Sequence, residues 1–343
     1  FDRVRAGNPE EYRTTFAKGS SLDQVLADWK PSIDKIENEW PTLLEFENDL
    51  AKKVGPMSIQ KPLEERMDDI DSYYDSIQLE SKPISDKAVA AVVSEWSKIR
   101  GLHPRSPQKT VDLMKKSTNS GSPFFTKRRA VVNKTMPCHV WMDSPTSVMQ
   151  TLDGNDWYAA AVLGWRGQEG GPTDEDVKQR VVWMFPFAVN IQELQVYQPG
   201  IESAQKFNLV PAWVNLESVD QRITRLFDTK GKSDLVICTD FSKFDQHFNS
   251  DMQECAKSIL AKILDNSSES RRWLEEVFPI KYAIPLAYDF GKIRKGLHGM
   301  GSGSGGTNFD ETLTHRALQY EAAQSVNKML NPNSQCLGDD GIL

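Results

Sequence analysis

Apolar residues recur at intervals of three and four between positions 252 and 264, a spacing that turns one face of a helix toward a core. The spacing predicts an amphipathic helix whose buried side is formed by Met252, Cys255, Ala256, Ile259, Leu260, Ile263 and Leu264. The run LVICTDF (235–241) is short and rich in β-branched residues, which predicts a buried strand on which this helix packs. QCLGDDGIL (335–343) predicts a strand, a tight turn and a second strand.

The N-terminal part of the chain, residues 20–100, has a mostly helical pattern. Within it, the stretch 85–99 predicts a helix with Ser85 as its N-cap. Proline, serine and lysine are frequent over 101–135, which predicts loops there. The helical segments before residue 85 are expected to be separated at Pro31, Pro41, Pro56 and Pro62.

Two further loops are indicated by glycine. GQEGGPTDED (167–176) is expected to be a loop that leads into the apolar run VVWMFPFAV (181–189). KGLHGMGSGSGG (295–306) predicts a glycine-rich loop that leads into a helix from about 307 to 330. Asn331-Pro332 is expected to end that helix.

Composition limits the class of protein. Of 343 residues, 39% are hydrophobic and 26% are charged, as in an ordinary globular protein with enough apolar material for a large core. No run approaches the 18 apolar residues that a membrane span needs, so none is expected. The four cysteines lack a CxxC pair, which argues against a disulfide scaffold and a zinc finger and favours a reduced compartment. Cys238 and Cys336 are expected on neighbouring strands, yet as free thiols.

The charge is unevenly distributed. The net charge is −7, and residues 1–100 hold 14 basic and 20 acidic side chains. The stretch 113–142 contains six basic residues and no carboxylate. A polyanionic partner would therefore be bound locally at this stretch, although a solvated basic loop would show the same composition.

Carboxylates mark the ends of the two predicted strand segments. Asp339 and Asp340 lie between two glycines in the hairpin, where they could be no more than a turn. Asp240 ends the apolar strand, and Asp245 follows five residues later. If the hairpin lies beside that strand, Asp240 and Asp339 could together bind two divalent cations, Mg²⁺ or Mn²⁺. Two such ions stabilise the attacking and leaving oxygens of a phosphoryl transfer.

The glycine-rich segment GMGSGSGGTNFDE (299–311) satisfies the pattern G-x-G-x-x-G, but the preceding residues do not form the buried strand that a dinucleotide-binding loop requires. A Walker-type phosphate loop is excluded because Thr307, not lysine, follows Gly306. Because the segment leads directly into a long helix, we expect a loop that lets the backbone approach a sugar or a phosphate.

Taken in order, DFSKFD (240–245), SGSGGT (302–307) and GDD (338–340) resemble motifs A, B and C of viral RNA-dependent RNA polymerases of the right-hand type. The spacings, about 60 and about 30 residues, are also similar. The pair Thr307-Asn308 and the segment TNSGSPFFTKRR (118–129) resemble double-stranded RNA viruses of the picobirnavirus and partitivirus kind.

The resemblance implies a set of site residues. Asp240, Asp339 and Asp340 would be catalytic and would hold two Mg²⁺ ions, with Mn²⁺ as a substitute. The ribose of the incoming nucleotide would meet Asp245, Ser302, Gly303, Thr307 and Asn308. The triphosphate would meet Lys178 and Arg180, with Arg166 as a competitor. Template RNA would meet Ser120, Gly121, Pro123, Lys127, Arg128 and Arg129.

One position departs from the pattern S-G-x-x-x-T-x-x-x-N of the resembled family. Its asparagine, which holds the Asp245 equivalent, falls on Glu311, and an ionised glutamate cannot donate a hydrogen bond. We expect Asn308 to serve as the substitute donor. Glu311 would then turn away, share a proton with Asp245, or pair with a cation.

The fold implied is an α/β (α+β) right-hand polymerase whose palm carries a small antiparallel sheet. The expected divisions are an acidic helical region (1–100), fingers (101–231), palm with motif A (232–264), a fingers insertion (265–295) and palm with motifs B and C (296–343). The chain is expected to be a fragment that ends just after motif C, without the thumb.

The implied activity is RNA-templated RNA synthesis from ribonucleoside triphosphates, in replication and transcription of a viral genome. Single- and double-stranded RNA and a viral capsid protein are the expected partners, in the virion interior and the host cytoplasm. Two alternatives stay open: a reverse transcriptase or DNA polymerase, and a non-catalytic RNA-binding structural protein with a degenerate palm. Asp245 argues against the first, because reverse transcriptases usually carry an aromatic residue near that position.

Overall fold

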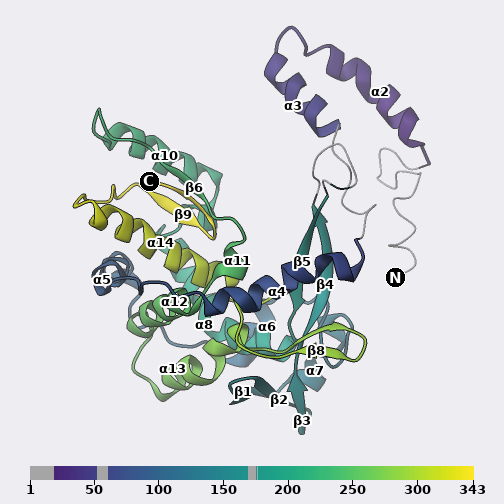
Figure 1. The fold of residues 1–343 in the computed structure, drawn as a ribbon, viewed down its shortest axis with the longest axis vertical. Helices are drawn as coiled ribbons and strands as arrows, with labels where there is room; N and C mark the ends of the chain where they lie inside the picture. Colours follow the sequence, from purple (N-terminus) through teal and green to yellow (C-terminus); the bar gives the residue numbers. More distant parts are fainter. Residues whose placement is uncertain (1–18, 52–60, 169–174, 176) are drawn as a thin grey trace. The chain divides into compact units, whose positions relative to one another are not determined.

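The structure is a computed structural model that describes residues 19–51, 61–168, 175 and 177–343 (Figure 1). The chain divides into two compact units. Unit 1 consists of Phe1–Met67 with Gly164–Val181, and unit 2 of Asp68–Leu163 with Val182–Leu343. The five divisions expected from the sequence stay predictions.

Unit 1 contains the helices α2 (Leu22–Asp34) and α3 (Pro41–Ala51) and the short 3₁₀ helix η1 (Leu63–Arg66). As expected, a proline starts α3, and Pro62 precedes η1. The expectation for Pro31 is wrong, because it lies inside α2, where its missing N–H removes a single hydrogen bond near the helix end. Pro56 lies outside the described residues.

The strands β4 (Ala161–Gln168) and β5 (Lys178–Met184) run through both units. They belong to a four-stranded sheet of order β5-β4-β7-β8, with β7 (Leu286–Asp289) and β8 (Lys292–Arg294). Most of the expected loop 167–176 lies outside the described residues, although Gln168 still belongs to β4. The following apolar run completes β5 and begins the next helix.

Unit 2 contains a three-stranded antiparallel sheet of order β6-β10-β9. It is made by β6 (Cys238–Asp240), β9 (Gln335–Leu337) and β10 (Asp340–Ile342), which confirms the predicted hairpin and its position beside the strand. The strand is shorter than expected and is not buried, since Cys238 and Asp240 are exposed and Thr239 is half-buried. β6 forms an edge of the sheet, and Leu235, which precedes it, is 83% exposed in the described part of the chain.

Three helices pack on one another next to this sheet, and one of them contacts β9. The amphipathic helix is confirmed as α12 (Ser250–Ile263), but it packs chiefly on α5 (Asp86–Glu95) and α14 (Thr307–Ser325) instead of on the strand. Ser85 caps α5 as predicted, accepting a hydrogen bond from the Ala88 N–H. In Figure 1, α14 lies beside β9. It ends before the predicted 330, because Asn327 adopts a left-handed backbone with φ of +55°.

The segment 101–135 is not all loop as expected. Ser106 caps α6 (Pro107–Leu113), which proline starts, and α7 (Val132–Thr135) follows the 3₁₀ turn η4 (Arg128–Ala130). A meander of β1 (Cys138–Ser144), β2 (Ser147–Leu152) and β3 (Asn155–Ala159) comes next.

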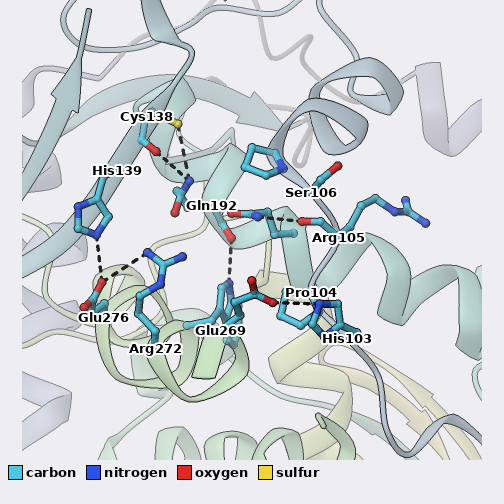
Figure 2. A pocket seen from close by; sticks show the side chains of 13 residues that line it. His103, Pro104, Arg105, Ser106, Cys138, His139, Gln192, Glu269, Arg272 and Glu276 are labelled. Atoms are coloured by element: carbon cyan, nitrogen blue, oxygen red, sulfur yellow. Dashed lines mark hydrogen bonds and ion pairs between the residues drawn. The ribbon is translucent and has the colours of Figure 1, made fainter. Parts of the chain in front are cut away.

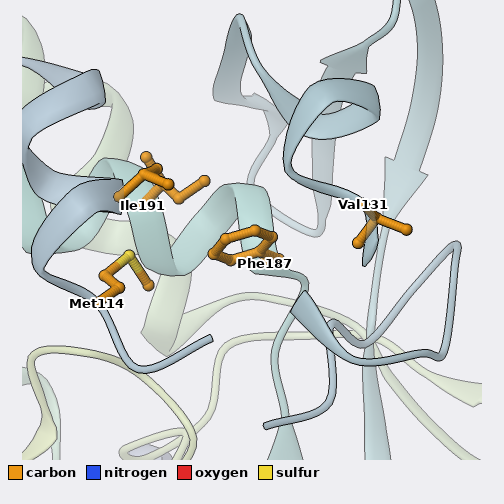
Figure 3. Close-up of a cluster of buried hydrophobic side chains, with 5 residues drawn as sticks. Met114, Val131, Phe187 and Ile191 are labelled. Carbon is orange, nitrogen blue, oxygen red and sulfur yellow. The ribbon is translucent and has the colours of Figure 1, made fainter. Parts of the chain in front are cut away.

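The long helix α8 (Phe187–Lys206) holds this region together. Its Phe187 and Ile191 pack with Met114, Val131 and Val111 in one buried cluster (Figure 3).

The remaining elements of the large unit are short, apart from α10. They are α4 (Met67–Asp75), η2 (Ser76–Gln78), η3 (Ser97–Ile99), α9 (Pro211–Val214), α10 (Leu216–Thr229), α11 (Phe244–His247), α13 (Ser268–Arg272), the π-helical turn η6 (Trp273–Val277) and the 3₁₀ helix η7 (Phe278–Tyr282). None of the helices in the described part of the chain is both long and apolar enough to cross a bilayer.

All four cysteines are free. The strands of Cys238 and Cys336 are not neighbours as expected, since β10 lies between them. Gly341 of β10 is the register partner of Cys336, and Ile342 that of Cys238.

An ion pair between α5 and α14 fastens these helices. The Arg316 side chain is 6% exposed and donates from Nε and Nη2 to the carboxylate of Glu95. Its Nη1 donates to Gln319 and Ser334. We therefore expect Glu95→Ala to lower the free energy of unfolding by about 2–3 kcal/mol, because a largely buried guanidinium loses its counter-charge. Denaturant unfolding would measure this, and an effect no larger than that of the exposed control Glu80→Ala would contradict it.

Candidate active site

Three carboxylates gather where the palm hairpin meets β6. Because β10 runs antiparallel to β6, Asp340 lies directly opposite Asp240, and their side chains leave the same face of the sheet. Asp339 lies in the turn before β10, and all three residues are exposed. Partial burial and the negative charges of Asp339 and Asp240 raise the pKa of Asp340 above its usual value. The direct strand partner of Asp240 is thus Asp340, with Asp339 beside them.

The turn that carries Asp339 is held by α14. Gly338 has a left-handed backbone with φ of +55°, which suits glycine, and its N–H donates to Thr312 Oγ1 at 2.9 Å. Its carbonyl oxygen lies 2.8 Å from Nδ1 of His315, whose Nε2 lies 3.1 Å from Thr239 Oγ1. Burial lowers the pKa of His315, so the neutral ring donates from Nδ1 and accepts at Nε2.

Neither Thr312 nor His315 was expected at the site. Both lie on one face of α14, three positions apart, and the only signal in the sequence was a polar pair inside a predicted helix. Gly341 completes the arrangement, because a Cβ there would collide with Thr239 and the His315 ring.

Asp245 and Glu311 form a second acidic group. Glu311 is 5% exposed, and its Oε1 is buried without a hydrogen-bond partner. Burial and a hydrogen bond with Asp245 raise the pKa of Glu311 well above its usual range. Glu311 is therefore a neutral acid that can donate to Asp245, which corresponds to the shared-proton alternative.

Asn308 has a different partner from the one expected. Its Oδ1 accepts a hydrogen bond from Trp213 Nε1 at 2.7 Å, and the described residues show no hydrogen bond from Asn308 to Asp245. Tyr73, which the sequence reading missed, is buried next to the same pair. Burial and the charge of Asp245 raise the pKa of its hydroxyl, which also interacts with Ser302.

The glycine-rich loop reaches the site because its glycines have no side chains. A Cβ at Gly303 would collide with the Trp183 carbonyl, and one at Gly306 with the Tyr197 ring. The Met300 N–H donates to the Asp245 carbonyl at 2.8 Å, which ties the loop to α11. Thr307 Oγ1 is within hydrogen-bond distance of the Gly301 and Ser304 carbonyls and closes the loop.

The predicted template residues are folded into a compact loop. Ser120 is 1% exposed, and its Oγ accepts from the Thr126 N–H, so it supports the loop. Gly121 has φ of +61°, and Pro123 follows a cis peptide bond. Lys127 and Arg129 are exposed, as an RNA contact requires.

Arg128 differs from these two basic neighbours. Its Nη2 donates to Asn190 Oδ1 at 2.7 Å, its Nε donates to the Asn119 carbonyl at 3.3 Å, and its guanidinium lies over the Phe187 ring. This side chain is already held by protein groups.

The predicted triphosphate residues Lys178, Arg180 and Arg166 lie on β5 and β4 within unit 1 and are exposed. Arg180 donates from Nε and Nη2 to Gln168 Oε1 at 3.0 and 2.7 Å. Their role at the triphosphate stays a prediction.

A pocket of about 660 Å³ lies elsewhere in unit 2, between α8, β1 and α13 (Figure 2). Two of its histidines contact acidic side chains: His139 lies 3.1 Å from Glu276, and His103 lies 3.0 Å from Glu269. None of the predicted site residues lines it.

The palm carboxylates fit divalent metal ions. Their donors are hard oxygens, and partial burial and like charges, which raise the pKa of Asp340, leave a repulsion that a cation would relieve. Among the residues described, no three His, Cys, Asp or Glu side chains form a complete metal cage. Mg²⁺ does not need one, because it typically uses one or two carboxylates and completes its shell with water and substrate phosphates.

The small antiparallel sheet backed by helices, the carboxylates on adjacent strands and the glycine loop beside Asp245 define the palm of a right-hand polymerase. Residues 56–343 match the family model of viral RNA-dependent RNA polymerases. The chain therefore belongs to the viral RNA-dependent RNA polymerase family, which confirms the resemblance seen in its motifs.

Similarity to individual polymerases supports the family assignment. The chain is 63% identical, over all 343 residues, to a potential RNA-dependent RNA polymerase of human picobirnavirus (strain Human/Thailand/Hy005102/-), and spans 64% of that protein. A crystal structure of a human picobirnavirus RNA-dependent RNA polymerase matches with a TM-score of 0.87 at 62% identity, covering 100% of this chain and 65% of that one. An insertion-loop deletion mutant of such a polymerase gives 0.88, at 62% identity, with 100% and 67% covered.

A more distant structure shares only the fold. The Sicinivirus 3Dpol polymerase is 12% identical, with a TM-score of 0.55, and the match covers 80% of this chain and 61% of that one.

The protonated Glu311 gives a stability prediction. In the unfolded chain the group ionises above its ordinary pKa of 4.5, whereas the folded chain keeps the proton, so rising pH favours unfolding. Glu311→Gln removes this titration and keeps a neutral donor. Its stability relative to wild type should therefore increase between pH 5 and 8, by up to about 1.4 kcal/mol per pH unit. Denaturant unfolding across this range, with Glu80→Gln as an exposed control, checks it; a pH-independent difference would show that Glu311 ionises in the fold.

Proposed function

We propose that this chain carries the nucleotidyl-transfer centre of an enzyme that makes RNA on an RNA template, in replication and transcription of a viral genome. The observation that carries the proposal is the register of β6 and β10, which sets Asp240 opposite Asp340 with Asp339 in the adjoining turn. The family membership supports the same activity.

Asp240, Asp339 and Asp340 would hold two divalent ions, Mg²⁺ with Mn²⁺ as a substitute. When bound, such ions stabilise the attacking and leaving oxygens of phosphoryl transfer. The chain's part is to fix the carboxylates before substrate arrives, through the β6–β10 pairing and the contacts of Thr312 and His315 with the turn.

Selection of ribonucleotides is assigned to Asp245. A carboxylate accepts a hydrogen bond from the ribose 2′-hydroxyl, and a deoxyribonucleotide leaves that acceptor without its donor. Glu311 and Tyr73 interact with Asp245, while Ser302, Gly303, Thr307 and Asn308 would form the sugar pocket. This favours an RNA polymerase over a reverse transcriptase or DNA polymerase.

RNA and triphosphate contacts follow from the exposed cations. Lys127 and Arg129 would bind template phosphates, and Lys178, Arg180 and Arg166 the nucleotide triphosphate. Single-stranded and double-stranded RNA and a viral capsid protein remain the proposed partners, with action in the virion interior and the host cytoplasm.

The test of the proposal is Asp339→Ala in the full-length protein. We expect RNA synthesis from ribonucleotides to fall by at least about 100-fold, because charge stabilisation is the largest single contribution to such a reaction. The fold should persist, since the change relieves carboxylate repulsion. Incorporation of labelled rNTPs and dNTPs, with the exposed control Asp220→Ala, measures both activity and sugar preference.

Near-normal synthesis by the Asp339→Ala variant would contradict the two-metal assignment. Preferred use of dNTPs by the wild type would favour the reverse transcriptase alternative. No synthesis by the wild type with either substrate would favour a structural RNA-binding protein.

Template binding gives a separate prediction. Lys127→Ala and Arg129→Ala should each reduce the slope of log affinity against log salt by about 0.7 on single-stranded RNA, the value for one lost phosphate contact. Filter binding or anisotropy at several salt concentrations would measure this. Lys109→Ala, an exposed lysine on α6, serves as control; an unchanged slope in the double variant would mean that the basic stretch is only a solvated loop.

A further inference from the structure

Two loops of the proposed polymerase site rest on the same short piece of chain. One is the 118–129 loop, which carries the proposed template contacts Lys127 and Arg129, and the other is the glycine loop, residues 299–306. The shared piece runs over 183–193, the end of β5 and the start of α8. These three segments are far apart in sequence and all belong to unit 2.

The 118–129 loop is joined to this piece by backbone and side chain. The Phe187 N–H donates to the Ser120 carbonyl at 2.8 Å. Arg128 donates from Nη2 to Asn190 Oδ1 at 2.7 Å and lies over the Phe187 ring, which Figure 3 shows at the start of α8. A Cβ at Gly121 would lie 2.5 Å from the Phe185 carbonyl oxygen, so the approach is close.

The glycine loop is joined to the same piece by polar side chains of α8. Asn190 Nδ2 donates to the Gly303 carbonyl at 3.2 Å. The Glu193 carboxyl accepts from the Ser304 hydroxyl, and its Oε1 accepts from the Gly305 N–H at 3.2 Å. Glu193 is fully buried, and the buried ammonium of Lys281 interacts with it as an opposite charge.

Asn190 therefore uses both ends of one amide. It is 4% exposed; its oxygen accepts from Arg128, and its nitrogen donates to Gly303 and to Glu193 Oε1 at 3.2 Å. The orientation is fixed by chemistry, because a guanidinium only donates and a backbone carbonyl only accepts. An amide is the group that can satisfy both loops at once.

We propose that Asn190 and Glu193 are positioning residues that fix the glycine loop relative to the 118–129 loop, which carries the proposed template contacts, so that the template side of the site influences the ribonucleotide selection assigned to Asp245. The inference rests on the proposed function. Arg128 then transmits the position of its loop through Asn190 and does not act mainly as a phosphate contact. Loss of this link changes nucleotide selection at a distance from the sugar, because Gly303 is adjacent to Ser302 at the predicted ribose pocket.

The experiment separates the two ends of the amide in the full-length protein. Asn190→Asp keeps an acceptor for Arg128 but removes the donor to Gly303 and places a second carboxyl beside Glu193. RNA affinity should stay within about twofold of wild type, while the preference for rNTP over dNTP falls about 3- to 10-fold, as for one lost hydrogen bond. Asn190→Leu removes both the acceptor and the donor, so both the RNA affinity and the preference for rNTP should fall.

A double-variant cycle tests whether Arg128 affects nucleotide selection through Asn190. Arg128→Ala should lower the rNTP preference about 3- to 10-fold in the wild-type background and by less than about twofold in the Asn190→Leu background. Lys134→Ala, an exposed cation of the same basic stretch, is the matched control and should not change sugar preference.

Ser304→Ala breaks the contact with Glu193 from the glycine loop and leaves the residues of α8 unchanged. This variant should lower the preference for rNTP through a higher KM for rNTP, with kcat nearly unchanged. Unchanged preference in both Asn190→Asp and Ser304→Ala would overturn the proposal, as would an Arg128→Ala effect of equal size in both backgrounds. Wild-type protein that makes no RNA would instead contradict the proposed function, which distinguishes the two failures.

Discussion

The candidate active site depends on one strand pairing. β10 is hydrogen-bonded to β6 on one side and to β9 on the other, and this register brings Asp240 and Asp340 together although they are far apart in sequence. Partial burial and the like charges of Asp339 and Asp240 raise the pKa of Asp340. The pairing persists because α14 fastens the turn through Thr312 and His315 and because Gly341 leaves room for the histidine ring. The stored repulsion is what a divalent cation would relieve.

A second constraint is the buried ionic network under the glycine loop. Lys281 and Asp310 are both fully buried, 3.1 Å apart, and Asp310 also accepts from the hydroxyls of Tyr197 and Tyr282. Buried charges are tolerated only when every partner is in place, so such a network holds its elements in one arrangement. Here it joins α8, η7 and the first turn of α14, directly beside the loop that Asn190 and Glu193 also hold. The flexibility that glycine gives to a loop is thus offset by rigid polar contacts on its protein side.

Burial keeps two titratable side chains near the site carboxylates neutral. Glu311 stays neutral beside Asp245, and His315 stays neutral beside the hairpin turn, so neither adds net charge to a region already rich in carboxylates. A protonated Glu311 also supplies the donor that an amide gives in the family pattern. Asn308, which lies close in sequence, is instead held by Trp213. The departure from the family pattern therefore changes the chemical group and keeps a neutral hydrogen-bond donor at that position.

The sequence by itself determined the features that depend on local pattern: the cap at Ser85, the amphipathic face of α12, the hairpin around Asp339, and a motif order specific enough to indicate the family. Local pattern could not show that Leu235 is exposed, that α12 packs on helices, or that Asp340 is the strand partner of Asp240. Nor could it assign Arg128 to Asn190 or a proton to Glu311. Only the tertiary structure decided these, because burial, register and pKa depend on which distant groups share a small volume, and neighbours in the sequence do not specify that.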